Sequence, residues 1–486
     1  MSASVARVGD VLGVGSRAAW LIAIAGVGGL AALVALATRQ GMLPMALGLA
    51  VLALLTLVSV RWPLLPLAAF AVLIPIEQVV VFPGFGTISR FAGILFAVAY
   101  GVPRLSRIPR LSRLTFGAMP SAGWAYSGWA IVSLGWAIDA GTAWLHLQTL
   151  IQLFLIAVLV ADFVVQRPAI VRPIFWVYSL SAAATALIGT QSYIAGNLYQ
   201  DARAVAIQGQ DPAQFAAILL PALVFGLYEV LNGGRRILGS AVALLGTIGV
   251  VVSGTRGAWF AAAIVVLFFI LPQLRPRRRI AAIAMTLALL LVAYQIPGIS
   301  SLVADRTGNA LSTGGAGRTN IWSVAVTIYG TAPVLGVGYA NFPVAYTPDV
   351  VRASDVTSWA TLQGRGPHDL VVGTLIELGP IGLLLLALFL GPLVLRRGWG
   401  PDAATVRAAL ASLLTAGLFL DILSSPKQVW LVIGLAAGLT SIAWRNGRTA
   451  LLDGNPATPA ADAGLTADPS AYGRRPDVSS VPGRRQ

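Results

Sequence analysis

Long apolar runs, separated by short polar or glycine- and proline-rich breaks, dominate the chain. Runs of about 18 to 22 apolar residues recur along nearly its whole length, and each is long enough to cross roughly 30 Å of hydrocarbon as a helix. The pattern predicts an all-α polytopic membrane protein with about 12 to 14 transmembrane helices, the lower number applying if the segments near 63–82 and 87–101 are re-entrant. Clear examples of such runs are Ala18–Ala37, Gly41–Val60, Leu145–Val164, Ile280–Ile296 and Val371–Leu390.

The overall composition supports the same class. Hydrophobic residues make up 57% of the chain, charged residues 10%, and the mean hydropathy is +0.81. A soluble globule of this composition would expose a largely apolar surface. The chain has no cysteine, which excludes disulfides and thiolate metal sites.

The basic residues orient the predicted helices. The net charge is +15, but arginines in a polytopic protein mostly mark cytoplasmic loops, so we expect no nucleic-acid partner. An even number of predicted spans separates each arginine cluster from the next, so all clusters can be cytoplasmic together with both termini. The clusters are Arg104, Arg107, Arg110 and Arg113; Arg167 and Arg172; Arg235 and Arg236; Arg275 and Arg277 to Arg279; Arg396, Arg397 and Arg407; and Arg445 and Arg448.

The predicted spans divide the chain into five regions. One long hydrophilic insertion, roughly 70 residues, interrupts the late spans, and long structured insertions are more often functional than decorative. The C-terminal segment is rich in Ala, Pro, Gly, Asp and Ser and is expected to be disordered. The regions are a cytoplasmic tail 1–16, transmembrane helices 17–296, an extracytoplasmic loop with catalytic elements 297–369, transmembrane helices 370–445 and a cytoplasmic tail 446–486.

A few arginines fall on the extracytoplasmic side, where the positive-inside bias predicts few, and we single out Arg203, Arg256 and Arg318. Arg256 lies in the turn 253–257 between two apolar runs, so we expect it near the level of the lipid headgroups. It could snorkel to lipid phosphates, or face the bundle interior and bind a diphosphate through forked, charge-assisted hydrogen bonds. Arg203 could instead be a solvated loop charge. Charged residues at membrane depth are functional candidates by default.

His368 is one of only two histidines in the chain and directly precedes an apolar run. Asp369 is expected to cap the start of that helix, which would hold the imidazole at the membrane surface. An imidazole can accept a proton from a hydroxyl near neutral pH, although His368 could also be a simple interfacial residue. The other histidine, His146, lies in an apolar helical pattern and is expected to be an internal hydrogen-bonding residue.

Missing motifs narrow the chemistry further. The sequence has no DxD pair for a metal–nucleotide-sugar complex, no Walker loop and no HExxH motif. These absences favour a reaction without metal or cofactor, in which arginines stabilise a leaving diphosphate. Glu377 and Asp421 lie in or near predicted spans, and the sequence assigns them no role.

Five short motifs follow one another between roughly residues 200 and 390, and in this order they resemble the O-antigen ligase and Wzy-type polymerase family. The earlier helices are similar to that family only in hydropathy. The chain departs from the family at Asp369, where Asn is usual, and lacks the glycine and asparagine that often accompany the position of Arg203. The motifs are Ser253 to Ala258, Gly317-Arg318 with Trp322, Gly336 to Phe342, His368-Asp369, and Glu377 to Gly382.

This resemblance implies a GT-C-like membrane glycosyltransferase that is metal-independent and inverting. The implied donor is a glycan on undecaprenyl diphosphate, and the acceptor is a hydroxyl of lipid A–core for a ligase or of a growing chain for a polymerase. The implied location is the bacterial cytoplasmic (inner) membrane, with the active site on its periplasmic side. Membrane lipids and other proteins of envelope-polysaccharide assembly are further candidate partners.

The resemblance also implies roles for individual residues. His368 would act as general base, while Arg256 and Arg318 bind the diphosphate and Arg203 contributes more weakly. The remaining members of the implied substrate-binding set are Gly336, Gly338 and Asn341. A transporter or flippase of lipid-linked oligosaccharide is the competing interpretation, although the two halves show no matching pair of broken helices. An inactive scaffold in an envelope-polysaccharide complex is a third.

Overall fold

The structure is a computed structural model, and it describes most of the chain beyond the first 57 residues. The predictions for the tail 1–16, the span Ala18–Ala37, nearly all of Gly41–Val60, the cluster Arg104 to Arg113, Gly317, Arg397, Asp421 and the tail from residue 453 lie outside the described residues. The described residues are 58–59, 61–79, 81–82, 86–101, 116–198, 203–207, 210–232, 234–296, 298–312, 318–354, 356, 365–396, 398, 400–420, 422–423 and 426–452.

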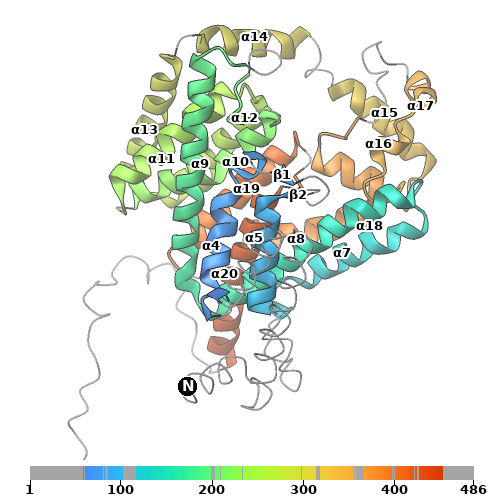
Figure 1. Cartoon of the computed structure of the whole chain (residues 1–486), viewed down its shortest axis with the longest axis horizontal. Coiled ribbons are helices and arrows are strands. Elements are labelled where there is room, and N and C mark those ends of the chain that lie inside the picture. Colours follow the sequence, from blue (N-terminus) through green and yellow to red (C-terminus); the bar gives the residue numbers. More distant parts are fainter. Residues whose placement is uncertain are drawn as a thin grey trace, which may run out of the picture.

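Helices make up nearly all of the described structure (Figure 1). Two short strands, β1 (Val81–Phe82) and β2 (Gly86–Thr87), pair antiparallel in a hairpin. The helices in chain order are α4 (Leu64–Leu73), α5 (Ile88–Phe96), α7 (Ser121–Val132), α8 (Ala140–Gln166), α9 (Val171–Ile194), α10 (Pro212–Leu231), α11 (Arg236–Val252), α12 (Arg256–Val265), α13 (Pro276–Tyr294), α14 (Ile299–Ser312), α15 (Arg318–Thr331), α16 (Phe342–Ala345), α17 (Pro348–Ala353), α18 (Leu370–Leu395), α19 (Ala403–Gly417) and α20 (Lys427–Leu452).

Five of these helices are long and apolar enough to cross a bilayer, which confirms an all-α polytopic membrane protein. They are α8, α9 with the turn before it, α10, α18 and α20, and five shorter apolar helices accompany them in the described residues. The total of 12 to 14 spans stays a prediction. The predicted span Ile280–Ile296 corresponds to α13, which is not among the five because three arginines in its first turn shorten the apolar stretch.

Two of the arginine clusters lie at the same end of the helix bundle, as the sequence predicts. Arg172, at the start of α9, forms an ion pair with Glu229 near the end of α10 at 2.8 Å. The Arg235 guanidinium, just before α11, lies 5.6 Å from the centre of the Trp176 ring on α9. The clusters of Arg172 and Arg235 therefore share one end of the bundle. The α9–α10 and α11–α12 connections lie at the other end, because successive helices of this group pack side by side and reverse direction.

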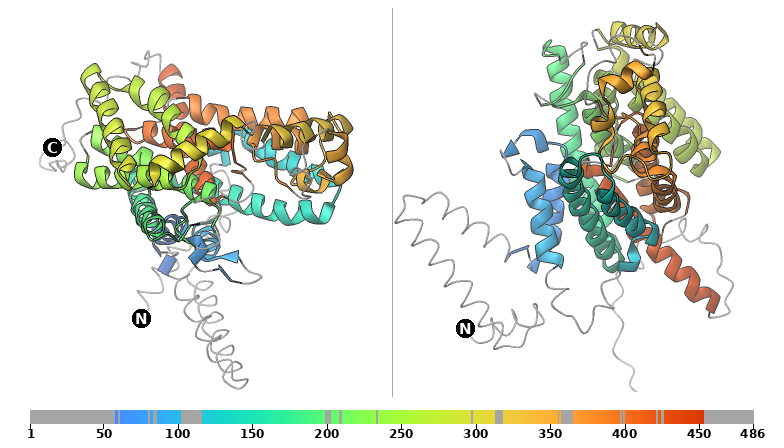
Figure 2. Two further views of the ribbon diagram at one scale, coloured as in Figure 1. Left: turned by 90° about the horizontal axis from the view of Figure 1, so that it is seen from above. Right: turned by 90° about the vertical axis from the view of Figure 1, so that its right-hand side faces the viewer.

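The long hydrophilic insertion is largely helical where the structure describes it. Its helix α15 buries Ile321, Val324 and Ile328, as their spacing predicts, in a small apolar core that also includes Phe342 and Tyr346. We call residues 318–354, which contain α15, α16 and α17, the cap. The cap lies over the α7–α8 connection, and Figures 1 and 2 show α13 on the opposite side of the molecule. Helix α20 continues to Leu452, past the predicted boundary at residue 445.

Candidate functional site

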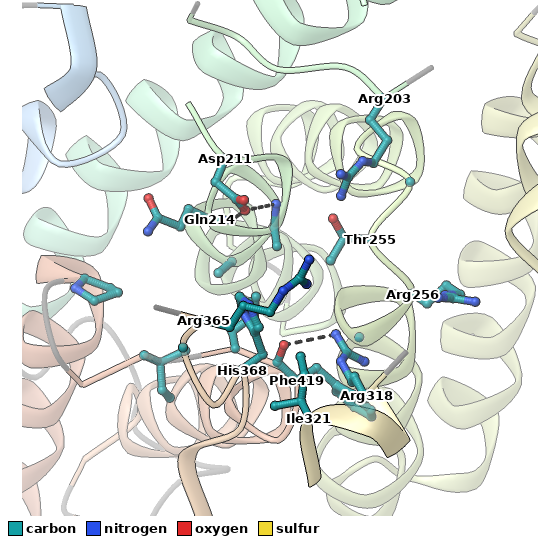
Figure 3. A pocket seen from close by; sticks show the side chains of 18 of the residues that line it. Arg203, Asp211, Gln214, Thr255, Arg256, Arg318, Ile321, Arg365, His368 and Phe419 are labelled. Carbon is teal, nitrogen blue, oxygen red and sulfur yellow. Dashed lines mark hydrogen bonds between the residues drawn. The ribbon is translucent and has the colours of Figure 1, made fainter. Parts of the chain in front are cut away.

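A cavity of about 760 Å³ opens at the end of the bundle opposite the clusters of Arg172 and Arg235 (Figure 3). Its walls come from the α9–α10 connection, the starts of α10, α12, α15 and α20, the stretch before α18, and the α19–α20 connection. The cavity brings together four residues that the sequence singled out, and a further arginine, Arg365, also lines it. The four are Arg203, Arg256, Arg318 and His368.

The turn before α12 fixes the positions of Arg203 and Arg256. The Ala204 backbone N–H donates to the Val252 carbonyl at 3.0 Å, which holds the Arg203 segment against the end of α11. The Thr255 hydroxyl donates to the Pro212 carbonyl at 3.2 Å and ties the turn to the start of α10. Arg256 is the first residue of α12, where the helix dipole favours a bound anion.

A close approach at Gly257 connects the turn to Arg318. A Cβ atom at Gly257 would lie only 2.6 Å from the Cβ atom of Phe419, so α12 and the α19–α20 connection approach closely only because this residue has no side chain. The Arg318 guanidinium donates to the Phe419 carbonyl at 3.1 Å and lies 5.0 Å from the centre of the Phe419 ring. Phe419 therefore links the turn that carries Arg256 to the guanidinium of Arg318.

We expect Gly257→Ala to disturb this link. The added methyl group must displace Phe419, and overpacking of this kind costs about 1–3 kcal/mol. Thermal unfolding and donor binding of the purified variant would measure the effect. Gly128→Ala on α7 is the matched control, because a Cβ atom there meets nothing within 4 Å. Equal behaviour of the two variants would contradict the role assigned to Gly257.

The cavity concentrates positive charge. Burial lowers the pKa of Arg318, the neighbouring Arg256 lowers it further, and Asp369 opposes the shift. A guanidinium nevertheless stays protonated in proteins, so both groups remain positively charged and can bind an anion. Burial raises the pKa of Asp369, while hydrogen bonds from two backbone N–H groups and the charge of Arg318 act in the opposite direction.

His368 lies in a strained backbone conformation beside a helix cap. Asp369 accepts hydrogen bonds from Val371 N at 2.7 Å and Val372 N at 2.9 Å, which confirms the predicted cap of α18. His368 has a φ of +48°, a left-handed value that few residues other than glycine adopt. Such strain often accompanies functional positions. His146, by contrast, is exposed on α8, so the expectation of an internal residue is wrong.

The segment from Gly336 to Asn341 does not line the cavity. It docks on a kink in α18, where Gly379 has a φ of +69°. Pro380 has no N–H to donate to the Ile376 carbonyl, which accepts a hydrogen bond from Val337 N at 2.9 Å instead. The Glu377 carbonyl accepts from Gly338 N at 2.9 Å. The kink thus gives the cap a place to attach.

Side chains complete the attachment. The Glu377 carboxylate accepts hydrogen bonds from Ala340 N at 2.9 Å and Phe342 N at 3.3 Å. The Asn341 side chain accepts from Asp139 N at 2.6 Å, which joins the cap to the α7–α8 connection. These contacts of Asn341, like those of Gly336 and Gly338, hold the cap in place. The role in substrate binding that was predicted for these three residues stays a prediction.

Sequence reasoning missed part of the cavity wall. Arg365 could have been predicted from the sequence, because it lies only three residues before the candidate base His368. Asp211 caps α10 through Ala213 N at 2.7 Å and also lines the cavity. Gln214 and Gln428 carried no signal, because nothing in their local sequence indicates that α10 and α20 meet at the same cavity.

A comparison with known families finds a match in the central part of the chain. Residues 241–387 match the family model described as O-antigen ligase. The match contains Arg256, Arg318 and His368, whereas Arg203 and Gln428 lie outside it. The comparison with curated proteins finds no match.

Proposed function

We propose that the cavity is the active site of a membrane glycosyltransferase, because residues 241–387 match the O-antigen ligase family model and contribute to its wall. The enzyme would transfer a glycan from undecaprenyl diphosphate to an acceptor hydroxyl, either of lipid A–core or of a growing polysaccharide. The convergence of four arginines and one histidine in one cavity carries this proposal. The cavity lies opposite the clusters of Arg172 and Arg235, so the positive-inside rule favours the periplasmic face of the inner membrane.

The arginines suit a diphosphate. Guanidinium groups bind phosphate oxygens through paired, charge-assisted hydrogen bonds. The charge of Arg256 lowers the pKa of Arg318, and a bound diphosphate would offset the repulsion between the two guanidinium groups. These groups would also supply the positive charge that stabilises the leaving diphosphate, without a metal ion.

A second cavity supports a lipid-linked donor. It measures about 370 Å³, and mostly apolar side chains from α10 to α14 line it. Trp259, Ala262 and Val266 contribute from α12 and its continuation, and α12 is the helix that begins with Arg256. An apolar cavity on this helix suits a polyprenyl chain and would offer nothing to the base of a nucleotide sugar.

The proposed reaction is a direct displacement. His368 removes the proton from the acceptor hydroxyl, and the oxygen attacks the anomeric carbon of the donor sugar. The bond between that carbon and the diphosphate oxygen breaks, and the electron pair leaves with the diphosphate beside Arg256 and Arg318. Attack from the opposite face inverts the anomeric configuration.

Reconstitution tests the proposal. Purified protein in lipid vesicles, mixed with lipid-linked donor and acceptor, is expected to release undecaprenyl diphosphate and form a glycosylated acceptor. Translocation of the donor without release would instead indicate a transporter. Surface polysaccharide from a deletion strain separates the two acceptors: free chains of normal length indicate loss of a ligase, and single repeat units indicate loss of a polymerase.

A further inference from the structure

One part of the cavity wall carries amide groups instead of arginines. Gln428, on the first turn of α20, is only 2% exposed, yet it lines the cavity. Within the part of the chain that the structure describes, its side chain makes no hydrogen bond to the protein. Its amide atoms are not among the fully buried polar atoms that lack a partner, so the amide reaches the cavity surface and can bond there to a ligand or to water.

A partly buried ion pair anchors Lys427, the residue before Gln428. Lys427, the only lysine in the chain, donates hydrogen bonds to the Glu77 carboxylate and to the Thr87 hydroxyl, the latter at 3.1 Å. Ser89 also donates to Glu77, at 2.8 Å. Consecutive helical residues point about 100° apart, so anchoring Lys427 beside the β1–β2 hairpin turns Gln428 toward the cavity.

Two polar residues at the start of α10 line the same cavity. Gln214 lines the cavity two positions beyond the first residue of α10, and Asp211 lies beside it. Figure 3 shows Asp211 and Gln214 on the side of the view away from Arg256 and Arg318. A diphosphate would be repelled by the Asp211 carboxylate, whereas sugar hydroxyls can donate to it. Amide groups both donate and accept hydrogen bonds, which also suits hydroxyls.

We propose that Gln428, Gln214 and Asp211 form the subsite for the acceptor sugar and bind it through its uncharged hydroxyl groups. This inference rests on the proposed function. The cavity then has two chemically distinct walls: arginines for the donor diphosphate, and amide and carboxylate groups for the acceptor.

Steady-state kinetics of Gln428→Ala would test this subsite in the reconstituted enzyme, with lipid A–core glycolipid as acceptor. Losing one neutral hydrogen bond should raise the acceptor KM by roughly tenfold and leave the donor KM unchanged. Ser441→Ala, a buried position on the same helix away from the cavity, is the control. Gln214→Ala at the exposed start of α10 provides a second variant if Gln428→Ala does not fold.

The outcomes separate this inference from the proposed function. A raised donor KM with an unchanged acceptor KM would assign the wall to the donor, and no change in either would remove Gln428 from the site. Wild-type protein that releases no undecaprenyl diphosphate would refute the function itself. Binding of soluble core oligosaccharide, measured by calorimetry, then still tests the subsite without turnover.

Discussion

His368→Ala is expected to lower the rate of transfer by about 10²–10⁴-fold, the usual cost of losing a well-placed general base. Donor binding should change little, because the arginines that would hold the diphosphate come from other elements. Single-turnover release of undecaprenyl diphosphate would measure the chemical step. His146→Ala, at the exposed second histidine, is the control.

The backbone at His368 requires a second variant. Its φ of +48° is unfavourable for alanine, so His368→Ala could act through the backbone alone. Asparagine tolerates this conformation but cannot act as a base at neutral pH. Near-normal transfer by His368→Asn in reconstituted membranes would show that the imidazole is not the base.

Arg318→Ala is expected to reduce kcat/KM for the donor by about 10²–10³-fold, as removal of one electrostatic stabiliser does in other enzymes. Arg318→Lys should recover only part of this loss, since lysine keeps the charge but not the fork that reaches phosphate and the Phe419 carbonyl together. Steady-state kinetics and donor affinity of each variant would measure both effects.

Arg352→Ala is the matched control for Arg318, because Arg352 lies in the same cap, is exposed and forms an ion pair with Asp349 three residues away. Full activity of Arg318→Lys would show that charge alone suffices. Full activity of Arg318→Ala would remove Arg318 from the site.

Local patterns predicted the parts of the site that depend on local physics. Ile321, Val324 and Ile328 have helical spacing and all lie in α15, and the position of Asp369 before an apolar run predicted the cap of α18. The positive-inside rule identified arginines at the unexpected end of the bundle, and the structure gathers them in one cavity.

Tertiary contacts account for what the sequence could not show. A Gly-x-Gly pattern does not reveal whether the close approach it permits is to a ligand or to another backbone, and at Gly338 the structure shows the backbone of Ala137. Phe419 and Gln428 reach the cavity from the α19–α20 region, which carries none of the motifs that the sequence singled out.

The kink of α18 affects how loss-of-function mutations should be interpreted. A side chain at Gly379 would meet the Val334 carbonyl of the cap, and replacing Pro380 would supply an N–H that competes with Val337 N for the Ile376 carbonyl, so either change would weaken the attachment of the cap. A genetic screen would therefore score these positions as essential although neither lines the cavity. A position that is essential in such a screen can therefore be one that holds the cap in place or one that takes part in the reaction.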